Sequence, residues 1–138
     1  MNYSDKIELA EAFKQRTKKF AIDVIKLSSS FPKNPEGYIL AKQLIRSATS
    51  VAANYRAVCR ARSKAEFYSK ICIVVEEADE SLFWLELITE ADILNNNQTE
   101  ILLKEANEIL SVVASSKRTA SSFNKSINQQ FDNSIIPV

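Results

Sequence analysis

Apolar residues recur along most of the chain in alternating steps of three and four, the spacing that places side chains on one face of an α-helix. This spacing predicts four helices, over residues 4–30, 38–61, 64–92 and 98–128. The remaining residues, 129–138, lie beyond the last position of the fourth stripe and are expected to form a C-terminal tail. Each predicted helix has one continuous apolar stripe, so we expect all four to pack around a shared core.

The connections between the predicted helices are short and carry the signals that end and start helices. Two prolines and the only glycine fall within residues 31–37, which predicts a break there. Ser63, with Glu66 three residues later, has the pattern of a capping box, in which the serine caps a new helix and the glutamate reaches back. Because short connections make successive helices antiparallel, the sequence predicts an all-α, antiparallel up-down-up-down four-helix bundle, a single domain over residues 1–128.

The residue types present close most routes to catalysis. The chain has no histidine, which removes Ser-His and Cys-His nucleophile pairs and most zinc and di-iron sites. A single glycine leaves no Gly-rich loop for phosphate binding. Glu76 and Glu80 lie one helical turn apart and could share a cation, which is the only support for an enzyme or a metal site. We therefore expect a protein that is not an enzyme and has no metal and no cofactor.

The apolar segments and the cysteines bear on location. No apolar run approaches the roughly 20 residues of a membrane span, and the N-terminal segment has no apolar signal core. Cys59 and Cys72 lie on adjacent predicted helices but are offset along the helix axes by about seven residues, which is too far for a disulfide. Free thiols fit a reducing compartment. The expected location is the cytoplasm, without a membrane partner.

The third predicted helix has more apolar surface than one bundle core can cover. Four large apolar residues lie outside its main stripe: Val75, Phe83, Trp84 and Leu87. Large exposed apolar patches mark interfaces, and aromatic residues are enriched in them. We therefore predict that these residues form a contact between copies of the chain. The alternative is a broad core with one partly exposed tryptophan.

Charge is distributed unevenly over the second and third helices. Residues 36–65 hold six bases and one acid, whereas residues 66–92 hold eight acids and one base. Basic side chains on one face can neutralise phosphates and so bind nucleic acid without sequence preference. The candidate phosphate contacts are Arg46, Arg56, Arg60, Arg62, Lys64 and Lys70. The alternative is that these bases are solvated or pair with the neighbouring acids.

Several short motifs in residues 46–88 resemble a known family. They are Asn54-Tyr55-Arg56, Arg60-Ala61-Arg62-Ser63, Glu66-Phe67, Glu77-Ala78-Asp79-Glu80-Ser81 and Trp84-Leu85-Glu86-Leu87. Together they resemble the bacterial four-helix-bundle family of 23S rRNA intervening-sequence proteins. The resemblance implies an antiparallel bundle that assembles into a ring-like homopentamer. It also implies a relation to accessory proteins of diversity-generating retroelements, which are basic pentamers that bind nucleic acid and a reverse transcriptase.

Two functional hypotheses follow. In the first, the chain is a non-catalytic homo-oligomer that presents a basic face to RNA or DNA, with a protein partner such as a reverse transcriptase. In the second, it is an oligomeric protein-interaction scaffold with no nucleic-acid ligand, and its arginines pair with Glu76, Glu80 and their neighbours across subunits.

Overall fold

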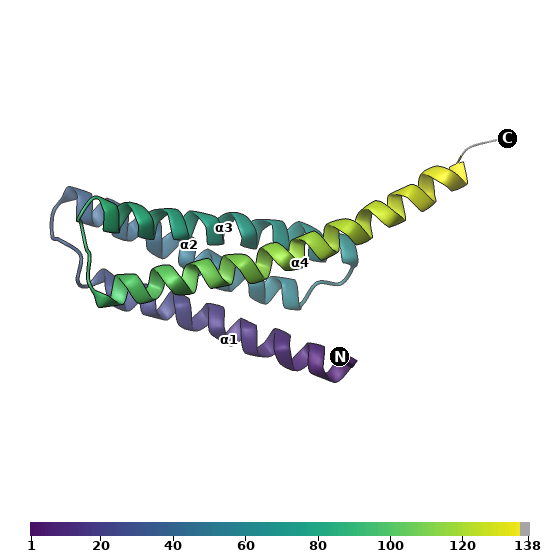
Figure 1. Cartoon of the computed structure of the whole chain (residues 1–138), viewed down its shortest axis with the longest axis horizontal. Coiled ribbons are helices and arrows are strands. Elements are labelled where there is room, and N and C mark those ends of the chain that lie inside the picture. Colours follow the sequence, from purple (N-terminus) through teal and green to yellow (C-terminus); the bar gives the residue numbers. More distant parts are fainter. Residues whose placement is uncertain (136–138) are drawn as a thin grey trace.

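The computed structural model describes the backbone of residues 1–135 and the side chains of residues 1–123 and 125, and over these residues the chain forms four α-helices. They are α1 (Tyr3–Ser28), α2 (Pro35–Cys59), α3 (Lys64–Glu90) and α4 (Asn97–Ile135). Successive helices run in opposite directions, and α4 extends past the end of the other three (Figure 1). The predicted all-α, up-down-up-down four-helix arrangement is confirmed.

The starts of the helices follow local capping chemistry. Asn34 accepts a hydrogen bond from the Gly37 amide at 2.8 Å, and Pro35 occupies the first turn, where its missing N–H costs nothing. This cap starts α2 before the predicted residue 38. Ser63 caps α3 by accepting from the Glu66 amide at 3.0 Å, as predicted. The Glu66 carboxylate accepts no hydrogen bond from the Ser63 backbone N–H in return, so only half of the expected capping box is present.

The C-terminal end of α4 differs from the sequence prediction. The predicted helix ends at residue 128, with a tail from 129, whereas α4 continues to Ile135. Neither proline nor glycine occurs between residues 97 and 135, so no backbone constraint stops the helix at the end of its apolar stripe. The predicted tail residues 136–138 lie outside the described residues.

The apolar stripes predicted from the sequence form the core. The largest side chains that are fully buried are Phe20, Leu44, Ile71, Leu85, Ile88, Leu102 and Ile109. Two small polar residues at the centre, Ser47 of α2 and Ser81 of α3, pair with each other, with Ser81 Oγ donating to Ser47 Oγ at 2.9 Å. Their size lets the two helix backbones approach closely, and their mutual hydrogen bond removes the cost of burying hydroxyls.

Helices α1 and α4 lie together over only part of their length. Arg16 of α1 binds Glu105 of α4, with Nε donating to Oε1 at 3.0 Å, and its Nη2 lies 2.6 Å from Glu108 Oε2. Beyond this link, the two helices diverge toward the N-terminus of α1 (Figure 1). The bundle is therefore open at the end that carries the α2–α3 connection.

Gly37 gives a stability prediction. A Cβ atom at this position would lie 1.9 Å from the Pro32 carbonyl oxygen and 2.9 Å from the Pro32 carbonyl carbon. Gly37→Ala is therefore expected to lower the free energy of unfolding by about 1–3 kcal/mol, although alanine is ordinarily favoured over glycine in a helix. Urea denaturation checks this, with Ser69→Ala at an exposed α3 position as the control. Equal or greater stability of Gly37→Ala would show that the α1–α2 connection is not packed this closely.

Candidate nucleic-acid interface

Four of the six predicted phosphate-contacting residues gather at the connection between α2 and α3. Arg56 lies in the last turn of α2, Arg60 caps that helix, and Arg62 and Lys64 lie on either side of the Ser63 cap of α3. All four are exposed. We call Arg56, Arg60, Arg62 and Lys64 the basic end. It forms because the short connection keeps the basic C-terminal end of α2 next to the first residue of α3, Lys64.

The salt bridges around the basic end are sparse. Arg62 Nε lies 3.4 Å from Glu66 Oε2, and the Arg62 side chain is 88% exposed. An exposed pair one helical turn apart contributes only about 0.3–0.5 kcal/mol, so a phosphate can replace it at small cost. Within the described residues, Arg56 and Arg60 have no salt bridge. The basic end is thus free to receive anions.

Arg46 has different surroundings, because acidic residues of α3 hold it. Its Nη1 lies 3.3 Å from Glu77 Oε2, and its Nη2 donates to Glu80 Oε1. Trp84 Nε1 donates to the same Glu80 oxygen at 3.2 Å. The hydrogen bond from Arg46 lowers the pKa of the Glu80 carboxyl. Arg46 therefore links α2 to α3 within one subunit and stands apart from the basic end.

Lys70, the sixth predicted phosphate contact, lies on α3 and is half-buried. It is less accessible than the four residues of the basic end. The structure thus brings Arg56, Arg60, Arg62 and Lys64 together. Arg46 is not part of this group because it pairs with acids of α3, and Lys70 is not because it is half-buried.

The Arg46–Glu80 pair gives a pH prediction. Because the pKa of Glu80 is lowered in the folded chain, its contribution to stability is present above the usual carboxyl range and is lost as pH falls through the folded pKa. Arg46→Gln is expected to remove at most about 1 kcal/mol near neutral pH, because the pair is partly exposed, and less at acid pH. Urea denaturation at about pH 7 and about pH 3 measures both, with Arg60→Gln as the control. A loss that is the same at both pH values would contradict a role through the Glu80 carboxylate.

The predicted oligomer contact has one strongly exposed member. Phe83 is 50% exposed and packs edge-on against Trp84, with ring centroids 5.0 Å apart, whereas Val75, Trp84 and Leu87 are half-buried. Other exposed apolar residues lie on α1, among them Ile7, Ile22 and Ile25, and the sequence prediction missed them. The step from Ile22 to Ile25 was the available signal, but the stronger stripe of the same helix obscured it.

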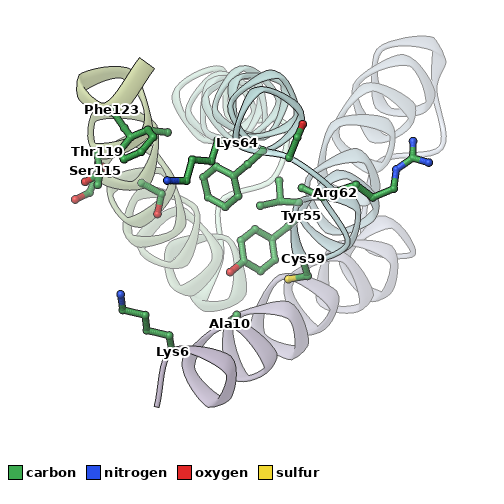
Figure 2. A pocket seen from close by; sticks show the side chains of 15 residues that line it. Lys6, Ala10, Tyr55, Cys59, Arg62, Lys64, Ser115, Thr119 and Phe123 are labelled. Carbon is green, nitrogen blue, oxygen red and sulfur yellow. The ribbon is translucent and has the colours of Figure 1, made fainter. Parts of the chain in front are cut away.

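A cleft of about 880 Å³ opens beside the basic end, where α1 and α4 diverge. All four helices and the α2–α3 connection contribute to its lining (Figure 2). Tyr55, Phe67 and Phe123 contribute aromatic rings, and Arg62 and Lys64 belong both to the lining and to the basic end. Tyr55 and Phe67 pack against the core, but they are only half-buried and also face this cleft.

Contacts within the cleft fix several of these side chains. Tyr55 packs edge-on against Phe13, with ring centroids 4.7 Å apart, and Lys64 Nζ lies 3.4 Å from the centre of the Phe123 ring. Burial raises the pKa of the Cys59 thiol, an effect that a hydrogen bond with Tyr55 partly offsets. Burial thus makes the Cys59 thiol less readily ionised than an ordinary cysteine. Both cysteines are free, as predicted.

Two features are absent from the described residues, a metal-binding cluster and a membrane-spanning helix. No group of three or more Cys, Asp or Glu side chains is placed there to hold a metal ion. No helix in that part of the chain is long and apolar enough to cross a membrane.

Comparison with known proteins gives a family and a structural neighbour. The model of the family described as "23S rRNA-intervening sequence protein" matches residues 11–115. A solved structure from Bacteroides thetaiotaomicron VPI-5482, described as a protein with unknown function from the S23 ribosomal protein family, is 30% identical in sequence. It superposes with a TM-score of 0.69 and covers 75% of this chain and 96% of its own. No curated protein matches the chain significantly.

Proposed function

The chain belongs to the 23S rRNA-intervening sequence protein family, and we propose that it is a non-catalytic, homo-oligomeric bundle whose basic end binds the phosphates of RNA or DNA. The observation that carries this proposal is the grouping of four exposed cations, Arg56, Arg60, Arg62 and Lys64, around one short connection. Such a group neutralises phosphates without reading bases, so the expected binding has little sequence preference.

Self-association is the second part of the proposal. The exposed Phe83, packed edge-on against Trp84, and the exposed isoleucines of α1 leave apolar surface that a neighbouring copy would cover. A ring, with five copies as the resemblance implies, would bring several basic ends to one nucleic-acid strand. The strand would then be bound more tightly than by one subunit, because later contacts are intramolecular. Light scattering of the purified chain tests this part, and a monomer mass at micromolar concentration would contradict it.

Retention of nucleic acid at low salt tests the first part. The full chain is expected to retain members of a mixed RNA and DNA pool on a filter at about 50 mM salt and to release them as salt rises. An oligomer that retains neither RNA nor DNA would instead support the protein-interaction scaffold. Arg46 gives that alternative some support, because it pairs with Glu77 and Glu80, although within one subunit rather than across subunits. The reverse transcriptase partner and the cytoplasmic location stay predictions.

A further inference from the structure

The cleft and the basic end form one continuous surface. Arg62 and Lys64 belong to both, and Lys6 lines the cleft from the opposite side, on α1. In Figure 2, Lys64 reaches across the cleft toward Phe123, Lys6 rises from α1 toward the same space, and Arg62 points away from it. A strand held at the basic end would therefore meet the opening of the cleft at Lys64.

Charge in the cleft favours an anionic ligand. Among the described residues that line it, Lys6, Arg62 and Lys64 are cationic, and none carries a carboxylate. The hydroxyl groups of Ser115, Ser116 and Thr119 on α4 add polar edges to an otherwise apolar wall. The only charged side chains in the lining are therefore cationic, and a ligand with a phosphate on one side and a flat apolar body fits both parts of the lining.

The aromatic residues supply faces for such a flat body. Phe123 is 43% exposed, and Tyr55 and Phe67 are half-buried with part of their surfaces in the cleft. Bases of single-stranded nucleic acid stack on aromatic side chains in this way, with little preference among the four bases. Because the cleft, at about 880 Å³, lies within the size range of small-ligand sites, it has room for one nucleotide.

We propose that the cleft receives an unpaired nucleotide of single-stranded RNA or DNA, with its base against Phe123, Tyr55 and Phe67 and its phosphate near Lys64 and Lys6. This inference rests on the proposed function, since the basic end must first hold the strand. It adds a preference for single strands, because a duplex keeps its bases paired and stacked and would have to flip one out to fill the cleft. Lys64 leaves the Phe123 ring for the phosphate, and the base takes its place on the ring.

Substitutions at Phe123 test the inference with the full chain. The probes are a labelled oligothymidylate of about 20 nucleotides and a duplex of the same length, measured by fluorescence anisotropy. Phe123→Ala is expected to weaken binding of the single strand by about 5- to 150-fold and to leave duplex binding within about twofold. Phe123→Trp is expected to retain the preference, since it keeps an aromatic face. Ile101→Ala, at an apolar position of similar exposure on the same helix (51% against 43%), is the control and is expected to bind as the wild type.

Cys59 gives a second readout that does not depend on a variant. Its side chain lines the cleft, whereas Cys72 of α3 is not part of the lining and serves as the internal reference. Bound oligothymidylate is expected to slow maleimide labelling of Cys59 several-fold and to leave Cys72 unaffected.

The outcomes separate the inference from the proposed function. The inference is wrong if single strand and duplex bind equally, Phe123→Ala binds the single strand as tightly as the wild type, and bound strand does not slow Cys59 labelling. The basic end would then still bind phosphates. If neither probe binds the wild-type chain, the proposed function is wrong and the inference fails with it. Thermal unfolding shows whether Phe123→Ala is folded. If this variant is unfolded, the Cys59 labelling of the wild-type chain decides the question.

Discussion

A variant with glutamine at Arg56, Arg60 and Arg62 is expected to lose at least about 100-fold in affinity for RNA or DNA at low salt. Hydrogen bonds to charged groups contribute about 1.5–3 kcal/mol each, and this variant removes three of the four exposed cations of the basic end. The dissociation constant at about 50 mM salt, from fluorescence anisotropy with a labelled single strand, measures the loss. The fold is expected to be unaffected, because all three side chains point into solvent and only Arg62 has a salt bridge in the described residues.

The matched control places the same charge change elsewhere on the molecule. Lys33, Lys42 and Lys104 are exposed and lie outside the basic end, and their replacement by glutamine lowers the net charge by the same three units. This control is expected to bind nearly as well as the wild type. If the two triple variants lose affinity equally, net charge and not the basic end governs binding.

Phe20→Ala is expected to lower the free energy of unfolding by about 3–5 kcal/mol. Phe20 is 2% exposed and belongs to the core that all four helices share, so its removal leaves a cavity that neighbouring side chains cannot fill without moving helices. Urea denaturation at one fixed protein concentration measures the loss, because oligomerisation makes apparent stability depend on concentration.

Ile22→Ala is the control for Phe20→Ala. Ile22 lies two residues further along the same helix and is 42% exposed, so its truncation leaves no enclosed cavity. Its expected effect on the free energy of unfolding is well below that of Phe20→Ala. A loss under about 1 kcal/mol for Phe20→Ala would mean that α1 does not pack as the fourth wall of the core.

Much of the fold could be predicted because spacing and burial are directly related in helices. Phe20, Leu44, Leu85 and Leu102, one from the apolar stripe of each helix, are buried, as the spacing predicts. The helix ends were harder to predict, because they depend on single groups. Asn34 starts α2 early through one hydrogen bond, and α4 continues beyond its stripe because no residue stops it.

The candidate site could be predicted only where it is local in sequence. The basic end comes together across one short connection, which the Ser63 cap revealed. By contrast, Arg46 and Glu80 are 34 residues apart, and their pairing depends on the register between two helices, which spacing along one helix does not give. The cleft depends on the divergence of α1 from α4, and no pattern within either helix encodes that angle.

The salt dependence of nucleic-acid binding by the wild-type chain tests the central claim most directly. If phosphates contact the basic end, the logarithm of the association constant for a single strand falls linearly with the logarithm of salt concentration. Each contact contributes about 0.7 to the slope, so four contacts in one subunit give a slope of about −3, and several subunits give a steeper one. A slope near zero, or no binding at about 50 mM salt, would contradict the claim that this end of the bundle binds nucleic acid.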